Sequence, residues 1–331
     1  MTAAEAATDA VNAPAGVPEH SGLRQKLLSV VRIGFTLTVL AAVAYTTATQ
    51  WREVKTYLAS VPWQSAVLSL MLVLVGLMGS AFAWRAALRD VGHDVPIKTG
   101  SQIYLIGLLA KYLPGSVWAY VMQMELGRKA GLPRSRAFLA SIVVTGIGTT
   151  VALVFGLLGL PALLSVGGAA VYAVAALVPF ALVCTHPKVL TWLVQKFLRL
   201  VRRPPLERNI TWRGVGAVAA WCAFTWVAYG LHLWLLANSQ AAPGFSGLLQ
   251  ATGAMALGMT AGLFAFLVPS GLGVREAIIV AALLPHVPAG AALGMALASR
   301  MLFVIGDLLA AAISALLGPI RPVPEAAQEV A

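Results

Sequence analysis

The stretch PSGLGVRE, Pro269 to Glu276, separates two apolar runs, 247–268 and 277–284. One proline and two glycines break any helix that enters it. Arg275 and Glu276 then follow at what the hydropathy places at membrane depth. Irregular backbone at that depth is tolerated only where protein or a water-filled cavity covers it, and charges there favour a functional site. The stretch therefore predicts a broken-helix hairpin that carries charge.

An earlier stretch repeats this pattern. GLLAKYLP, Gly107 to Pro114, matches GLFAFLVP, Gly262 to Pro269, at a constant offset of 155 residues. It lies in the apolar run 100–126, which is broken at Pro114 and Gly115 into arms too short to cross a bilayer. Two similar hairpins that enter from opposite faces are typical of an inverted repeat, which we predict here.

Composition sets the class of protein. The chain has 331 residues, of which 59% are hydrophobic and 11% charged, and its mean hydropathy is +0.84. Soluble domains carry about 25% charged residues. The apolar runs are continuous rather than alternating, which excludes a β-barrel and predicts an all-α polytopic membrane protein. The net charge of +11 resides mostly in short loops, so it indicates membrane orientation and no nucleic-acid partner.

The expected layout has a disordered tail, 1–23, a transmembrane domain, 24–320, and a C-terminal tail, 321–331. Its halves are about 24–186 and 204–320, joined by 187–203, whose helical apolar spacing predicts an amphipathic helix on the bilayer surface. Six full spans accompany the two re-entrant hairpins. They are expected at about 30–48, 64–83, 137–160, 166–184, 215–237 and 291–317.

Charge counting orients this layout. If 100–126 enters and leaves on one side, 18 of the 23 Lys and Arg lie on the side of the N-terminus. The positive-inside rule then places both termini in the cytoplasm and the protein in the cell (inner or plasma) membrane. Two short full crossings would give the same parity as a hairpin.

The most specific stretches resemble a known family. KYLPGSVW (111–118), GRKAGLPRSRA (127–137), PSGLGVREA (269–277), and Ser299-Arg300 followed by Asp307 resemble the membrane domain of lysylphosphatidylglycerol synthases and related stand-alone flippase-like proteins. The resemblance implies lipid movement between leaflets. Family members often carry a charged pair where this chain has VVTG, 143–146, and the aminoacyl-transferase domain of the bifunctional synthases has no counterpart here, so lipid lysylation is not expected.

The central charges form a predicted network. Arg275 and Glu276 point about 100° apart on a helix, so each needs its own partner. Arg300 and Asp307 lie two turns apart on one face, which allows Arg275 to pair with Asp307 and Glu276 with Arg300. A purely structural network that locks the hairpin is an equal alternative. The predicted lipid-binding residues are Arg275, Lys111, Pro114, Gly115, Pro269, Gly271 and Gly273, and the predicted charge network is Glu276, Arg300, Asp307 and Glu125.

Other polar and aromatic residues have simpler interpretations. Lys111 could attract a lipid phosphate, although snorkelling to the headgroups is favoured. Glu125 is expected to pair with Arg128 or Lys129. Trp118 and Tyr120 could line a path for the lipid, but aromatic side chains more commonly anchor a helix at the membrane interface, and anchoring is therefore favoured. His232 is expected to be a hydrogen-bonded packing residue.

The expected function is transport of an anionic lipid, either a phospholipid or a polyprenyl-phosphate lipid, between leaflets. No nucleotide-phosphate loop, HExxH, GxSxG or paired-cysteine motif is present, so we expect no catalytic residue, metal or cofactor. Two alternatives stay open. One is a membrane partner of an envelope-lipid or glycosyl-transfer enzyme, and the other is a lipid-modifying enzyme.

Overall fold

The computed structural model describes residue 48 and residues 51–113, 117–159, 168–200, 204–206, 208–241, 244–265, 271–285 and 287–322. Every regular element within these ranges is a helix, as predicted. The predicted span 30–48, apart from residue 48, and the predicted site residues Pro114, Gly115 and Pro269 lie outside them. The helices are α3 (Trp51–Ser60), α4 (Trp63–Asp90), α5 (Ile97–Leu108), η1 (Leu109–Tyr112), α6 (Trp118–Lys129), α7 (Arg134–Gly156), η2 (Leu157–Gly159), α9 (Gly168–Cys184), α10 (Pro187–Leu200), α11 (Trp212–Ala241), α12 (Gly244–Phe264), α13 (Val274–Leu283) and α14 (Ala289–Leu316).

Five of the described helices, α4, α7, α11, α12 and α14, are long and apolar enough to cross a membrane. Four of them coincide with predicted spans. A sixth span results if α9 and α10 count as one, although the chain bends by 75° between them. The fifth, α12, was expected as one arm of a re-entrant hairpin, but its 21 residues rise about 31 Å, which matches the hydrocarbon core.

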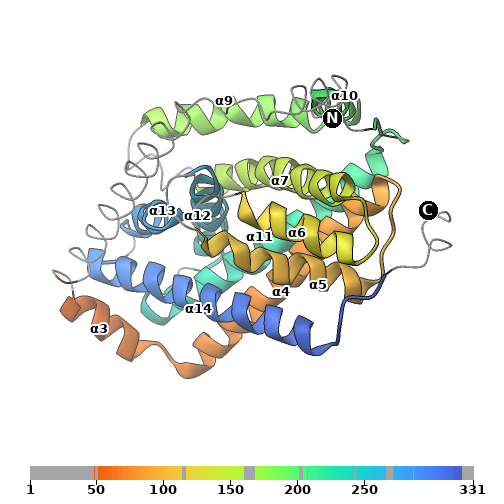
Figure 1. Cartoon of the computed structure of the whole chain (residues 1–331). Helices are drawn as coiled ribbons and strands as arrows, with labels where there is room; N and C mark the ends of the chain where they lie inside the picture. The colour runs from red at the N-terminus through yellow and green to blue at the C-terminus, as the bar shows by residue number, and fades with distance from the viewer. Residues whose placement is uncertain are drawn as a thin grey trace, which may run out of the picture.

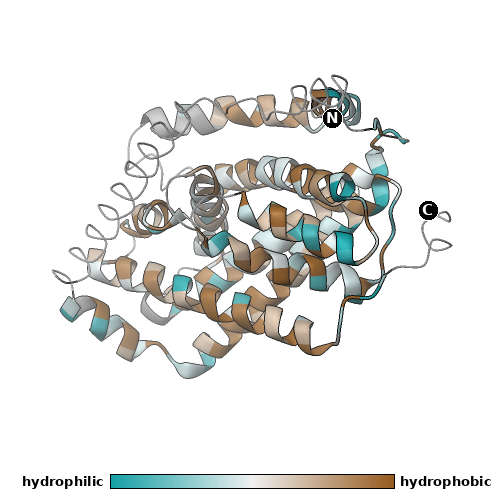
Figure 2. Ribbon diagram, in the orientation of Figure 1, coloured by the Kyte–Doolittle hydropathy of each residue, from teal (hydrophilic) through white to brown (hydrophobic). Residues whose placement is uncertain are grey.

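The basic segments meet at one end of the bundle. The carboxylate of Asp90, at the end of α4, accepts hydrogen bonds from the Thr211 N–H and hydroxyl just before α11. The Gln102 amide on α5 donates to the Ser314 and Gly318 carbonyls at the end of α14. Figure 1 shows the long helices running between this end, at the right, and α3 at the left, and Figure 2 shows hydrophilic residues on the loops of the right-hand end.

Similar contacts show at which end of the bundle each predicted hairpin starts and finishes. The segment α5–η1–α6 starts and finishes at the basic end, because Arg136, in the first turn of α7 that follows α6, donates to the Pro205 carbonyl before α11. The segment α12–α13 starts and finishes at the opposite end, where Tyr57 of α3 donates to the Leu236 carbonyl of α11 and packs on Gly294 of α14. The two segments therefore start and finish at opposite ends of the bundle, and their re-entrant course within a membrane stays a prediction. A repeat relation between the halves stays a prediction.

Glycine shapes the second break. Gly271 and Gly273 have φ of +62° and +84°, a region that other residues avoid. A Cβ on Gly271 would lie 2.3 Å from the Gly262 Cα, so the chain after the break touches the backbone of α12. The N–H of Gly273 donates to the Glu276 carboxylate (2.6 Å), which satisfies one of the open N–H groups at the start of α13. Gly271 and Gly273 therefore set the shape of the hairpin.

Two apolar clusters fill the bundle. One surrounds Trp84 and Leu88 near the basic end, and the other surrounds Met255 and Met295 near the opposite end. The predicted amphipathic helix is present as α10, which bends away from α9 and packs Val194 into the first cluster. Its place on a bilayer surface stays a prediction. The central turns of the long helices lie between these two clusters, and some of their residues line a cavity.

Candidate functional site

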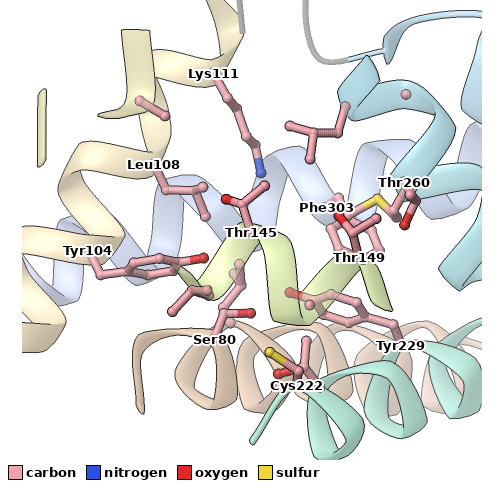
Figure 3. A pocket seen from close by; sticks show the side chains of 18 of the residues that line it. Ser80, Tyr104, Leu108, Lys111, Thr145, Thr149, Cys222, Tyr229, Thr260 and Phe303 are labelled. Atoms are coloured by element: carbon pink, nitrogen blue, oxygen red, sulfur yellow. The ribbon is translucent and has the colours of Figure 1, made fainter. Parts of the chain in front are cut away.

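A cavity of about 270 Å³ lies in the middle of the bundle, bordered by η1 and the start of α6 from the first hairpin and by the end of α12 and the start of α13 from the second. α4, α7, α11 and α14 line it with residues from their central turns, and α12 with residues near its end. Figure 3 shows Lys111 reaching into it from the first hairpin, with Ser80, Tyr104 and Tyr229 around its floor. The charged and polar lining residues are Ser80, Tyr104, Lys111, Tyr112, Tyr120, Gln123, Ser141, Thr145, Thr149, Thr225, Trp226, Tyr229, Thr260, Arg275 and Arg300.

The charges that line the cavity are all positive. Lys111, Arg275 and Arg300 face it, and none of the described residues that line it is acidic. The two nearby acids, Glu276 and Asp307, are buried and lie behind the cations. An anion that entered the cavity would therefore meet cations first.

Lys111 is held by the middle of α14. Its Nζ lies 2.6 Å from Oδ2 of Asp307, whose side chain is fully buried, whereas Lys111 keeps 22% of its side chain exposed. The Tyr112 hydroxyl donates to the same Oδ2 (2.5 Å). Oδ1 has no hydrogen-bond partner among the described residues. The pair therefore joins the first break to α14 and leaves the ammonium facing the cavity.

Arg300 is held by the start of α13. Its Nη1 donates to Oε1 of Glu276 (2.8 Å), and Oε2 of the same carboxylate accepts the Gly273 N–H. Glu276 thus joins α14 to the second break, and it lies in the first turn of α13, where the helix dipole favours an anion. One carboxylate fixes both the cation and the shape of the hairpin.

Arg275 is held without a carboxylate. No described acidic side chain forms an ion pair with it. Its Nη2 donates to the Ser299 hydroxyl (2.8 Å), and its guanidinium carbon lies 4.3 Å from the centre of the Phe303 ring. The residue is 5% exposed, and its Nε has no hydrogen-bond partner in the part of the chain that the structure describes. A buried guanidinium with an open donor next to a cavity is well placed to bind an anion.

A hydrogen-bond chain extends from Arg275 into the core. Ser299 accepts from Arg275, and its hydroxyl lies 2.9 Å from Nε2 of His232. Nδ1 of His232 lies 2.6 Å from the Ser69 hydroxyl, which donates to the His232 carbonyl. A neutral His232 with its proton on Nδ1 satisfies every contact, because Nδ1 then donates to the Ser69 hydroxyl and Nε2 accepts from the Ser299 hydroxyl. His232 is therefore fully buried and hydrogen-bonded, as predicted, and it supports the residue that holds Arg275.

Half of the predicted charge network has the expected partners. Glu276 pairs with Arg300, as the helical spacing predicted. The predicted pair of Arg275 with Asp307 is wrong, because Asp307 is occupied by Lys111 and Tyr112. Spacing within one helix could not include a cation supplied by the other hairpin.

Three further residues differ from their favoured interpretations. Lys111 does not snorkel, because the buried carboxylate of Asp307 offers it a partner in a medium of low dielectric. Tyr120 is not an interface anchor, since it lines the cavity and bonds the Thr145 hydroxyl (3.0 Å). Trp118 is 45% exposed and does not line the cavity, which agrees with the anchoring interpretation.

Glu125 lies away from the cavity. It pairs with Arg128 (3.1 Å), as one of the two expected partners, and also with Arg134 (2.8 Å) across the loop between α6 and α7. Hydrogen bonds from Arg134 and then Arg128 lower the pKa of this exposed carboxyl. Glu125 is therefore part of the loop at the basic end and not of the central network.

Several site residues were not predicted. Tyr112, Ser299 and Phe303 hold the central charges, and Tyr104 and Tyr229 line the floor. Tyr112 and Ser299 lie beside Lys111 and Arg300 in the motifs quoted above, so adjacency was an available signal. The two floor tyrosines come from otherwise apolar helices, and only the packing reveals them.

The arrangement can bind an anion. Within the described ranges, no group of three or more His, Cys, Asp and Glu side chains could hold a metal ion. The N-terminal ends of α6 and α13 both border the cavity, through Ala119 and Arg275. Helix N-termini carry partial positive charge, which adds to that of the three cations.

Comparison with known proteins agrees with the resemblance drawn from the motifs. The family model described as the lysylphosphatidylglycerol synthase transmembrane region matches residues 29–311. A search of curated proteins found no match. The matched range includes every residue of the cavity and both hairpins, so the chain belongs to the family of lysylphosphatidylglycerol synthase transmembrane regions.

Proposed function

We propose that the protein moves an anionic lipid between the leaflets of the cell membrane, with its basic end and both termini in the cytoplasm. The observation that carries this proposal is the cavity at mid-bundle, which is lined by Lys111, Arg275 and Arg300 with their acids behind them. A headgroup that crosses the bilayer needs a polar site at that depth, and a phosphate suits guanidinium and ammonium groups.

The geometry supports transport in a second way. The segments α5–η1–α6 and α12–α13 start and finish at opposite ends of the bundle, and the described residues on each side of their breaks border the cavity. In transporters, binding sites at broken helices near the midplane serve a bundle that opens to each side in turn. The family supports a role in handling lipids. An enzyme activity is not part of the proposal.

Reconstitution tests it. Purified protein in liposomes should make a fluorescent phosphatidylglycerol in the inner leaflet accessible to a quencher added outside. Protein-free liposomes and the exposed-site variant Arg89→Gln serve as controls. Movement that appears only with a co-purified enzyme would support the membrane-partner alternative. A chemically altered lipid would support a lipid-modifying enzyme. No movement and no altered lipid would rule out both transport and modification.

A further inference from the structure

The cavity carries hydroxyl groups as well as charge. Ser80, Tyr104, Thr149, Tyr229 and Thr260 line it, and each comes from a different helix. In Figure 3 the hydroxyls of Tyr104 and Tyr229 turn toward each other above Ser80, on the far side of the space from Lys111. A site that binds only phosphate does not require these uncharged hydroxyls in addition to its three cations.

Two of these hydroxyls, those of Thr149 and Thr260, have no hydrogen-bond partner among the described residues. By contrast, the hydroxyls of two other cavity threonines, Thr145 and Thr225, donate to carbonyls one turn back in their own helices. Thr149 and Thr260 make no such bond to a described residue, although both line the cavity. Polar groups in a membrane interior need partners, so open hydroxyls at a cavity indicate a ligand or water that can bond them.

The cavity also lacks a group that an amine would need. None of the described lining residues is acidic, and both nearby carboxylates are already paired with cations. The lipid's own phosphate would neutralise the net positive charge of the site, so an ammonium on the same headgroup would lie beside Lys111, Arg275 and Arg300 with no described carboxylate free to pair with it. Repulsion of this kind selects among ligands as strongly as attraction does.

We infer that the lipid headgroup is a phosphodiester that bears free hydroxyls, such as a glycerol or a sugar, and no amine. The phosphate lies against Arg275 and Lys111, and the hydroxyls bond the wall formed by Ser80, Tyr104, Thr149, Tyr229 and Thr260. This inference rests on the proposed function for movement of the lipid, but the choice of headgroup can be measured as binding alone.

Binding comes first because it is independent of transport. The melting temperature of the purified protein should rise with glycerophosphoglycerol and should stay unchanged with glycerophosphoethanolamine at the same concentration. Equal stabilisation by both compounds, or by neither, would overturn the inference. Stabilisation by glycerophosphoglycerol without lipid movement in liposomes would overturn the proposed function and leave the headgroup assignment standing.

Transport rates of three lipids then distinguish the contribution of the phosphate charge from that of the headgroup hydroxyls. Fluorescent phosphatidylethanol carries the same phosphodiester charge as phosphatidylglycerol but no free hydroxyl, and phosphatidylethanolamine adds the amine. Phosphatidylglycerol should move about tenfold faster than phosphatidylethanol, since two or more hydrogen bonds are at stake, and phosphatidylethanolamine should move slowest. Comparable rates for phosphatidylglycerol and phosphatidylethanolamine would overturn the inference.

A matched pair of variants tests whether the cavity hydroxyls cause the difference in rate between phosphatidylglycerol and phosphatidylethanol. Thr149→Val removes a cavity hydroxyl without changing side-chain shape, whereas its neighbour Thr150 bonds the Gly146 carbonyl and lies outside the cavity. Thr149→Val combined with Thr260→Val should bring the rates of phosphatidylglycerol and phosphatidylethanol together, chiefly by slowing phosphatidylglycerol. Thr150→Val should leave their ratio as in the wild type. An unchanged ratio in the double variant would show that the wall does not bind hydroxyls.

Discussion

Lys111 and Asp307 form a 2.6 Å ion pair that connects the break of the first hairpin to the central turn of α14. Asp307 is fully buried, so its charge depends on Lys111 and on the Tyr112 hydroxyl. Removing one partner of a buried pair costs about 3–5 kcal/mol, because the other charge is left uncompensated. The pair therefore bears on stability and on the site at the same time.

Lys111→Met should lower the free energy of unfolding by about 3 kcal/mol, and the double variant Lys111→Met/Asp307→Asn should recover part of that loss. Thermal unfolding in detergent measures both. Arg89→Met is the control, because Arg89 is 65% exposed and lies 3.7 Å from Asp94, and exposed pairs contribute about 0–1 kcal/mol. A Lys111→Met protein as stable as the wild type would mean that Asp307 does not need its cation.

Arg275→Lys should fold and insert but lose most of its transport activity. Lysine keeps the charge but cannot donate two parallel hydrogen bonds, and it would not stack on Phe303 in the same way. We expect a loss of about tenfold or more in transport at nearly unchanged melting temperature. Full transport by well-folded Arg275→Lys would remove the case for bidentate recognition of phosphate, and full transport by Arg275→Ala would remove Arg275 from the site.

Ser299→Ala should weaken lipid binding more than it weakens the fold. The serine holds Nη2 of Arg275 and is itself bonded to His232. Loss of one hydrogen bond to a charged group corresponds to about a tenfold rise in the lipid concentration that gives half-maximal rate. Ser314→Ala is the matched control, since Ser314 is also buried on α14 but lies at the end of that helix, two turns beyond Asp307, and does not bond Arg275. Equal effects of the two variants on half-maximal concentration would assign Ser299 a structural role only.

Gly271→Ala should prevent correct packing of the second hairpin. The substitution demands a positive φ and places a methyl group 2.3 Å from the Gly262 backbone. Strain of this kind costs about 1–3 kcal/mol before the clash is counted. Gly146→Ala is the control, because a Cβ there meets nothing within 4 Å. Yield and melting temperature of the two variants, measured side by side, should differ clearly, and similar values would mean that the break can adjust.

Single cysteines test the orientation. In a background with Cys184→Ala and Cys222→Ala, Arg52→Cys should react with an impermeant reagent in intact cells, and Arg134→Cys should react only after the cells are opened. Both positions are exposed and lie at opposite ends of the bundle. The opposite labelling pattern would invert the topology, and labelling of both in intact cells would contradict the layout.

The sequence predicted the class of fold well, because membrane depth constrains it strongly. Continuous apolar runs, prolines and loop charges sufficed for four spans and for two broken segments at opposite ends of the bundle. Helix α12 was predicted as a hairpin arm and not as a span because Pro269 and the glycines after it mark a break, although the apolar run 247–268 is itself long enough to cross a membrane.

The candidate site was predicted less completely. Glu276 and Arg300 could be paired from helical spacing, since both were visible as charges in apolar surroundings. The partner of Asp307 came from the other half of the chain, and no spacing within one helix could supply it. The hydroxyl wall was missed for a related reason. Threonine and tyrosine are common in membrane helices, and only their convergence from five helices distinguishes these.

The five charged residues at the cavity sum to a single positive charge, since Lys111, Arg275 and Arg300 face two carboxylates. A phosphodiester carries one negative charge, so the site with its proposed lipid would be neutral, and the empty site would not. Moving one charge through the whole membrane potential changes the energy by about 2.3 kcal/mol per 100 mV. Voltage would then act on the return of the empty protein and leave the loaded step unaffected, so a membrane potential could give lipid flow a direction without any other source of energy.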